Sequence, residues 1–242
     1  MTSQSLEVQY AKDDEVGTAL PPWASVLVVV AHPDDESFGL GAVLDGFIMA
    51  GATVSVLCLT HGGASTLGAG PQLSQVRAKE LRNAADQLGI DSAVLLDYRD
   101  GMLSDVLRDI LSAEVLRELD DRPTDGLVVF DPSGITGHAD HTAATRAAVD
   151  AAAVMDLPVL AWTLPQDVAD ALNEEFDAGF VGHEQGDVDL VVPVLRKRQR
   201  SACLCHTSQA VPGSALWRRL ELLGNHEHLR WLRQPRRVSS KH

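Results

Sequence analysis

The stretch AHPDDE, residues 31–36, places a histidine and three consecutive carboxylates at the end of an apolar run. His32 and Asp35 are three residues apart, and the later segment HADH supplies His138 and His141, also three apart, where a helical pattern begins. Residues at i and i+3 share one face of a helix. Two histidines and one carboxylate that leave a coordination position open are a common hydrolytic zinc site. The sequence therefore predicts a metal-dependent hydrolase.

Zn²⁺ is the first expectation for the metal, and Fe²⁺ is the alternative, because the same imidazole and carboxylate donors suit both. Such a hydrolase also needs a base for water and an acid for the leaving group. Asp34, next to the expected ligand Asp35, is a candidate base. The histidine of the HADH pair that does not bind the metal is a candidate acid. A simpler interpretation makes Asp35 or Glu36 a helix cap, which accounts for one acid but not for the whole group.

Apolar, β-branched runs alternate along the chain with helical patterns. Strands are predicted over residues 25–32, 52–60, 92–98, 126–131, 158–164 and 187–194, and helices over residues 40–50, 73–88, 105–119, 139–155, 166–176 and 195–206. The strands are almost continuously apolar, which indicates a mostly parallel sheet covered by helices on both faces. The predicted fold is therefore an α/β, Rossmann-like three-layer sandwich.

The charged motifs follow predicted strands directly. In open parallel sheets, ligands bind beyond the carboxyl ends of the strands, so we expect AHPDDE and HADH to meet at that edge. A dinucleotide site is the obvious alternative for such a turn. However, the turn has no G-x-G-x-x-G sequence, and the acids of residues 34–36 would repel a pyrophosphate.

The chain of 242 residues is expected to form one domain over residues 21–242, preceded by a solvated arm over residues 1–20. Its net charge of −14 is uneven, because residues 196–242 carry 11 Lys or Arg and 2 Asp or Glu. Apolar residues interleave with these charges, which predicts basic C-terminal helices that pack on the acidic body or on a sister subunit in a homo-oligomer. A nucleic-acid partner is not expected, because the preceding acidic body would repel phosphates.

No apolar run reaches the ~18 residues of a membrane helix, so no membrane partner is expected. The first residues lack the basic and apolar regions of a secretory signal. Cys58, Cys203 and Cys205 are an odd number with no disulfide framework. These features predict a cytoplasmic protein.

The paired motifs AHPDDE and GHADH resemble the LmbE/PIG-L family of metal-dependent N-deacetylases, which act on N-acetylglucosaminyl conjugates and related amides. The resemblance extends over most of the chain, through the segments RAKELRNAADQLGI, LDYRDGML and CHTSQ. It implies that His32, Asp35 and His141 hold the metal and that Asp34 is the general base. It also implies that His138 is the protonated group that stabilises the oxyanion and protonates the leaving amine.

The resemblance further implies that Asp140 orients a histidine from outside the ligand set. Arg77 and Asp100 would hold sugar hydroxyls or the remote part of the substrate. Each has a simpler interpretation, since Arg77 can form an intrahelical ion pair with Glu80 and Asp100 can be a turn residue before Gly101.

The expected activity is zinc-dependent removal of an N-acetyl group from an N-acetylglucosaminyl conjugate or a related amino-sugar derivative. An alternative within the same chemistry is an amidase that acts on a glucosaminyl thiol conjugate or a secondary metabolite. A non-catalytic metal- or sugar-binding module is a further alternative, but a module that only binds needs neither the extra Asp34 nor His138.

Overall fold

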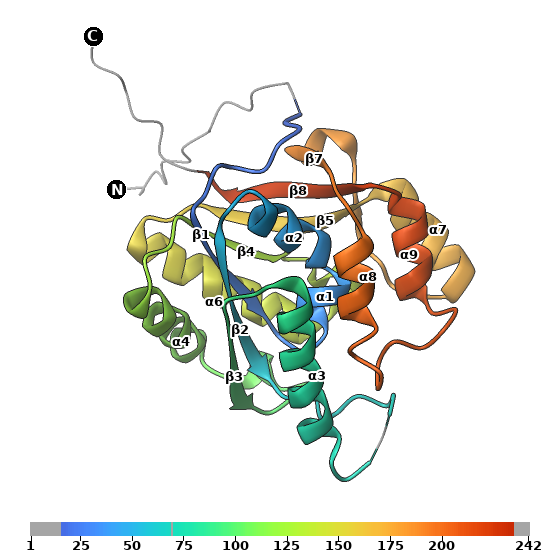
Figure 1. The fold of residues 1–242 in the computed structure, drawn as a ribbon, viewed down its shortest axis with the longest axis horizontal. Helices are drawn as coiled ribbons and strands as arrows, with labels where there is room; N and C mark the ends of the chain where they lie inside the picture. The colour runs from blue at the N-terminus through green and yellow to red at the C-terminus, as the bar shows by residue number, and fades with distance from the viewer. Residues whose placement is uncertain (1–15, 69, 235–242) are drawn as a thin grey trace, which may run out of the picture.

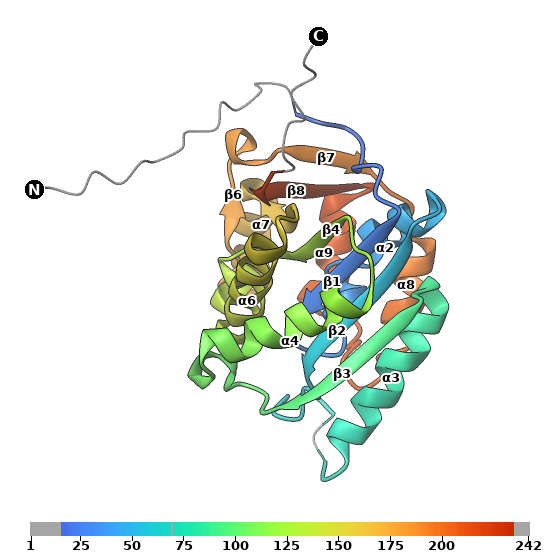
Figure 2. The same cartoon turned by 90° about the vertical axis from the view of Figure 1, so that its left-hand side faces the viewer.

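The computed structural model describes residues 16–68 and 70–234. Its centre is an eight-stranded sheet with the order β3-β2-β1-β4-β5-β8-β7, and β6 pairs separately with β5 (Figures 1 and 2). The strands are β1 Ser25–Val30, β2 Thr53–Thr60, β3 Ser92–Tyr98, β4 Gly126–Phe130, β5 Val159–Pro165, β6 Gly182–His183, β7 Leu190–Pro193 and β8 His226–Arg233. The strands from β3 to β5 are parallel, whereas β8 runs antiparallel to both β5 and β7. The sheet is therefore mostly parallel, and its antiparallel strand β8 lies between β5 and the edge strand β7.

Helices cover both faces of the sheet (Figure 2). The helices are α1 Asp35–Phe38, α2 Gly41–Met49, α3 Leu73–Leu88, α4 Arg108–Asp121, α5 Gly134–Gly137, α6 Ala139–Met155, α7 Gln166–Phe176, α8 Lys197–Cys203 and α9 Ala215–Leu223, with 3-10 turns at Leu103–Asp105 and Gln185–Asp187. Successive side chains of β1 enter opposite cores: Val28 packs with α2 and α3, and Val29 packs with α4 and α6. The predicted three-layer α/β sandwich is confirmed.

The prediction of helices throughout the basic C-terminal segment is wrong for residues 226–233, which form β8. The spacing of Leu229 and Leu232 imitates a helical face. The structure instead buries Glu227 and Leu229, two positions apart, inside the sheet. Glu227 contributes to this placement, because its carboxylate accepts a hydrogen bond from the indole Nε1 of Trp162 on the neighbouring strand (2.7 Å). A buried acid with a long-range partner leaves no periodic signal in the sequence.

The predicted solvated arm ends earlier than residue 20. Residues 1–15 lie outside the described ranges, but Gly17 forms a parallel bridge with Leu190 at the edge of the sheet. Leu20 packs against the core shared by α2 and the sheet. Residues 16–20 are therefore docked on the domain.

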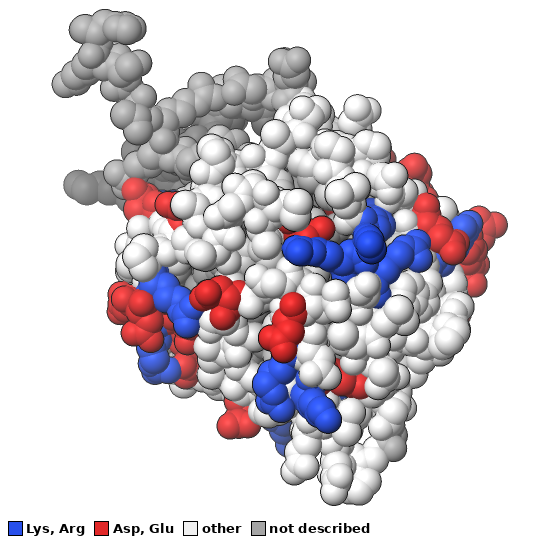
Figure 3. Space-filling view, viewed as in Figure 1, with Lys and Arg blue, Asp and Glu red and all other residues white. Residues whose placement is uncertain are grey.

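Basic side chains gather on the molecular face that includes α8 (Figure 3). Lys197, Arg198 and Arg200 of α8 are exposed, in keeping with the positive charge of the C-terminal segment. Within the described ranges, none of the helices has the length and apolarity of a membrane-spanning segment.

Candidate metal centre

The two charged motifs meet at the carboxyl edge of the sheet, as predicted. β1 and β4 are parallel neighbours, so the segments that follow them begin side by side. His32 follows β1 and Asp35 opens α1, whereas His141 lies in the first turn of α6, after β4. Donor atoms of these three residues all lie within 4.8 Å of one another.

A ring nitrogen of His32 and a ring nitrogen of His141 face each other at short distance. His141 Nδ1 lies 3.1 Å from the carbonyl oxygen of Gly134, and His32 Nε2 lies 3.0 Å from Asp100 Oδ1. An oxygen acceptor at one ring nitrogen assigns the proton to that nitrogen, so the other nitrogen of a neutral ring carries the lone pair. In two neutral rings the lone-pair atoms would be His32 Nδ1 and His141 Nε2, which are only 3.2 Å apart. Without a cation a proton can lie between these two nitrogens, and a metal ion that displaces this proton would be coordinated by both.

Asp35 completes the ligand group. Its Oδ1 lies 3.2 Å from His141 Nε2, and its Oδ2 accepts hydrogen bonds from the backbone of Ala31 and His32. Burial favours the neutral acid, but His141, His32 and these hydrogen bonds together hold the pKa of Asp35 below its usual value. Asp35 is therefore ionised at neutral pH. Two imidazoles and one carboxylate fit a divalent zinc or ferrous ion.

The remaining nitrogen of His32 faces two carboxylates. Asp100 Oδ1 is 3.0 Å from Nε2 and Asp140 Oδ2 is 3.4 Å from it. Burial opposes the charged ring, but these hydrogen bonds and the charge of Asp35 raise the pKa of His32 to about 10 in the absence of a cation. A carboxylate behind a ligating histidine fixes its ring and increases its basicity. Asp140 thus lies where the resemblance predicts an orienting residue, and the histidine beside it is His32.

Asp34 adopts a strained backbone conformation beside the ligands. Its φ is 126°, a value that costs a non-glycine residue about 1–3 kcal/mol. Its carboxylate lies 2.9 Å from Arg77 Nη2. Burial raises the pKa of Asp34 to about 6, although the charge of Arg77 opposes the shift. A carboxylate with such a pKa is a stronger base than an ordinary aspartate and is still ionised at neutral pH.

The side chain of Glu36 hydrogen-bonds the backbone of Asp34. Its Oε2 accepts the amide hydrogen of Asp34 at 2.9 Å, and its Oε1 lies 2.7 Å from His206 Nε2 and accepts from Ser37 Oγ at 2.6 Å. Glu36 and His206 are both fully buried. The sequence offered Glu36 only as a helix cap, because its partner lies 170 residues away.

We expect His206→Ala to lower kcat by roughly 10- to 100-fold while metal content stays near the wild-type value. Without His206, Glu36 loses a buried partner and holds Asp34 less firmly, and small misplacements of catalytic groups have costs of this size. His206→Gln, which keeps a donor, should recover part of the loss, and exposed His226→Ala is the control. Steady-state kinetics with metal analysis checks this. A lower melting temperature with unchanged kcat would make the pair purely structural.

His138 caps α6, because its Nδ1 accepts the amide hydrogen of Asp140 at 3.2 Å. This bond leaves the ring proton on Nε2. Burial lowers the pKa of His138, and the charges of His141 and His32 lower it further. The structure therefore disfavours the protonated His138 that the resemblance implies, and the neutral ring remains a hydrogen-bond donor.

Arg77 and Asp100, the predicted substrate-binding residues, both have partners within the chain. Arg77 is 3% exposed and donates to the carbonyls of Gly62 and Pro33 as well as contacting Asp34. The alternative ion pair with Glu80 does not form, because Glu80 accepts hydrogen bonds from Thr207 and Ser208. Asp100 binds His32 and the amide of Ala64. These contacts place Arg77 beside the candidate base Asp34 and Asp100 beside the candidate ligand His32, and a role in substrate binding stays a prediction.

A cavity of about 570 Å³ opens over the ligand group. Its lining includes the three ligands, Asp34 and His138, together with an apolar side made by Phe38, Phe130, Trp162 and Phe180. Gln209 also lines it and fastens the loop after β2, through Ser65 and Leu67. A cavity with charged groups on one side and aromatic rings on the other suits an amphipathic organic substrate.

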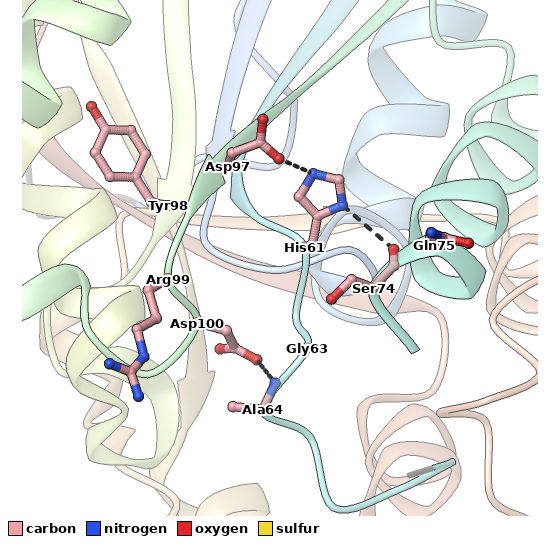
Figure 4. Close-up of a pocket in the computed structure, with 9 residues that line it drawn as sticks. All are labelled: His61, Gly63, Ala64, Ser74, Gln75, Asp97, Tyr98, Arg99 and Asp100. Atoms are coloured by element: carbon pink, nitrogen blue, oxygen red, sulfur yellow. Dashed lines mark hydrogen bonds and ion pairs between the residues drawn. The ribbon is translucent and has the colours of Figure 1, made fainter. Parts of the chain in front are cut away.

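A second hollow of about 480 Å³ lies on the other side of Asp100 (Figure 4). Here His61 bridges Asp97 Oδ1 (2.8 Å) and the carbonyl of Ser74 (3.4 Å), so both of its ring nitrogens face oxygen atoms. The Asp97 side chain is 94% exposed, which screens its charge. His61 therefore braces the segments around this hollow, and we assign the chemistry to the first cavity.

Fold and site together define an α/β protein with a candidate metal centre of two histidines and one aspartate. A family model described as PIG-L, GlcNAc-PI de-N-acetylase, matches residues 27–152, just over half of the chain. The chain therefore belongs to the PIG-L family, which confirms the resemblance drawn from the motifs.

Individual relatives agree with this assignment. The chain is 34% identical over 131 residues to a probable N-acetylglucosaminyl-phosphatidylinositol de-N-acetylase of Schizosaccharomyces pombe, covering 52% of this chain and 50% of the relative. It is 27% identical over 197 residues to a probable N-acetyl-alpha-D-glucosaminyl L-malate deacetylase 2 of Bacillus anthracis, covering 76% and 80%. The chain spans about half the length of the first curated relatives it matches.

The fold also matches solved structures. The zinc-inhibited form of teicoplanin deacetylase Orf2 superposes with a TM-score of 0.67 and 22% identity, over 87% of this chain and 98% of that chain. A likeness at this identity confirms the fold.

Proposed function

We propose that this protein is a metal-dependent hydrolase that removes the acetyl group from an N-acetylglucosaminyl conjugate. The observation that carries the proposal is the pair of ring nitrogens, on His32 and His141, that face each other beside Asp35 and next to the strained candidate base Asp34. Membership of the PIG-L family and the printed names of its relatives support an N-acetylated amino sugar as the substrate class.

His32, Asp35 and His141 would hold Zn²⁺ or, alternatively, Fe²⁺. The bound metal supplies Lewis acidity, which lowers the pKa of water and polarises an amide carbonyl. Asp140 and Asp100 keep the ring of His32 turned toward the metal position by accepting its Nε2 hydrogen.

In the proposed reaction, Asp34 accepts a proton from water as the oxygen of that water adds to the acetyl carbonyl. His138 donates a hydrogen bond from Nε2–H to the carbonyl oxygen, and keeps that hydrogen, as negative charge develops there. The carbon–nitrogen bond then breaks, and Asp34 returns the proton to the leaving nitrogen. The products are acetate and a free amine. This proposal moves the proton on the amine from His138 to Asp34, because the neutral, capped form of His138 is the favoured one.

The test measures metal content and acetate release together. We expect about one zinc or ferrous ion per chain and acetate release from N-acetylglucosaminyl conjugates that stops with a chelator and returns with added metal. Free N-acetylglucosamine and a phenyl N-acetylglucosaminide serve as the simplest substrates. Bound metal without acetate from any conjugate would overturn the acetyl specificity. Failure to bind zinc or ferrous iron would overturn the metal centre.

A further inference from the structure

Arg219 is a buried arginine that lacks a carboxylate partner within residues 16–68 and 70–234. Its side chain belongs to α9 and it is 7% exposed. The two other arginines that are buried in the described ranges are paired, Arg77 with Asp34 and Arg196 with Glu227. A buried charge is costly unless it is paired and hydrogen-bonded. The position of Arg219 therefore requires an explanation.

Among the acids, Glu227 has the largest electrostatic effect on Arg219, but its carboxylate already binds other residues. Its Oε1 lies 2.5 Å from Arg196 Nη1, and its Oε2 accepts a hydrogen bond from Trp162 Nε1 at 2.7 Å. Neighbouring Arg218 differs sharply from Arg219, because it points outward and pairs with Glu175. The two arginines of the sequence WRR thus have opposite environments, and Arg218 offers a matched control.

Only some of the hydrogen-bond donors of the Arg219 guanidinium have partners among the described residues. Its Cζ lies 4.9 Å from the centroid of the Trp162 ring, and its Nη2 donates to the carbonyl of Phe38. Its Nε is buried and has no hydrogen-bond partner. Nη1 also has no partner among the described residues and is not one of the enclosed polar atoms, and Arg219 lines the cavity.

Arg219 lines the same 570 Å³ cavity as the metal ligands. A continuous row of rings connects the two places. The ring of His141 is 4.9 Å from Phe130, and Phe130 is 5.4 Å from Trp162, over which Arg219 lies. The charge of Arg219 is therefore separated from the ligand group by two aromatic side chains along the cavity wall. A substrate with its acetamido group at the candidate ligand group can extend to Arg219, because both places line one cavity.

We propose that Arg219 is a specificity-determining residue. It binds an anionic group, a carboxylate or a phosphate, on the non-sugar part of the N-acetylglucosaminyl conjugate. This inference rests on the proposed function, because it names the substrate class of the same cavity. A guanidinium is the side chain best suited to planar recognition of these anions. The guanidinium lies over the ring of Trp162, and the anion would supply the missing partner.

Arg219 and Trp162 both lie outside residues 27–152, the region matched by the family model. They therefore belong to the part of this chain that can distinguish one conjugate from another without altering the metal centre. A purely structural alternative exists, in which Arg219 only holds the carbonyl at the end of α1. The two readings differ in one measurable quantity, the preference for an anionic substrate over its neutral analogue.

The experiment compares three substrates with the metal-loaded enzyme. They are an N-acetylglucosaminyl conjugate of a hydroxycarboxylic acid, the methyl ester of that conjugate, and an N-acetylglucosaminyl phosphodiester. We expect the wild-type enzyme to favour one anionic substrate over the ester in kcat/KM by roughly 10- to 100-fold, as a charge-assisted hydrogen bond would provide. The two anionic substrates distinguish carboxylate from phosphate.

Arg219→Met should bring that ratio close to one, chiefly through KM, whereas Arg218→Met should leave it unchanged. Arg219→Lys should recover part of the ratio, because it restores the charge without the planar fork. Metal content and melting temperature are measured for each variant. A wild-type ratio near one, or equal losses for the ester and both anions in Arg219→Met, would overturn the proposal and leave Arg219 as a structural contact.

Absence of acetate from all three substrates would instead overturn the proposed function. The inference is then judged by calorimetric binding of the two anionic conjugates and the ester to the metal-loaded protein. Preferential binding of an anion that Arg219→Met abolishes would support it, and equal binding of all three would reject it.

Discussion

Asp34→Asn should lower kcat by roughly 10²- to 10⁴-fold while the protein retains its metal, because removal of a general base typically has an effect of this size. The substitution keeps the shape of the side chain and leaves His32, Asp35 and His141 in place. It removes the capacity to accept a proton from water, together with the negative charge that pairs with Arg77. Single-turnover acetate release and metal analysis check the result, with the exposed Asp121→Asn as the charge-matched control.

The pH dependence of kcat/KM in the wild-type enzyme is a second test of Asp34 as the base. Since Asp34 must be ionised to act as a base and its folded-state pKa is raised to about 6, kcat/KM should fall as the pH decreases through a value no higher than about 6. A cation at the neighbouring site would shift this limb further down. Near-normal turnover in Asp34→Asn would remove Asp34 from the role of base. If both the metal and the turnover are lost, the substitution has damaged the site instead.

His141→Ala should lower metal affinity by more than about 100-fold and reduce acetate release to background. Loss of a partner that only orients a ligand already costs 10- to 100-fold, and His141 would be a ligand itself. Metal affinity is measured by competition with a chromogenic chelator, and turnover is measured at saturating metal. His226→Ala, at an exposed histidine that does not line the cavity, should match the wild type in both.

This variant also separates two candidate positions for the metal. Nδ1 of His32 faces one possible ligand group, with Asp35 and His141. Nε2 of His32 faces a second possible group, with Asp100 and Asp140. The carboxylates of the second group already accept backbone hydrogen bonds, from Ala64 to Asp100 and from Gly101 and Leu103 to Asp140. Metal bound to His141→Ala with unchanged affinity would place the ion in the second group and contradict the centre described above.

Much of the site could be predicted because its residues are close together in the sequence. His32, Asp34 and Asp35 lie within one turn, and His138 and His141 lie within another. Each group follows an apolar strand, and the carboxyl ends of parallel strands meet at one edge. Local spacing and the alternation of strands with helices were therefore enough to bring the two groups together.

The supporting contacts were not predictable in the same way. The sequence gives no sign that Glu36 meets His206, that Arg77 turns away from Glu80 toward Asp34, or that β8 enters the sheet as a strand. Each of these three features depends on which distant segment packs against the residue concerned. In addition, buried charged residues interrupt the apolar periodicity on which sequence interpretation relies.

The sequence by itself thus determined the α/β architecture, the edge at which the chemistry lies, and the residues that could bind a metal and accept a proton. Those properties follow from short-range spacing and from the polarity of whole segments. Only the tertiary structure decided that His138 is capped and neutral, that Glu36 holds a strained Asp34, and that Arg219 lines the cavity with no carboxylate partner in the described part of the chain. These depend on distances between segments far apart in the chain, which desolvation and packing fix only when the domain has folded.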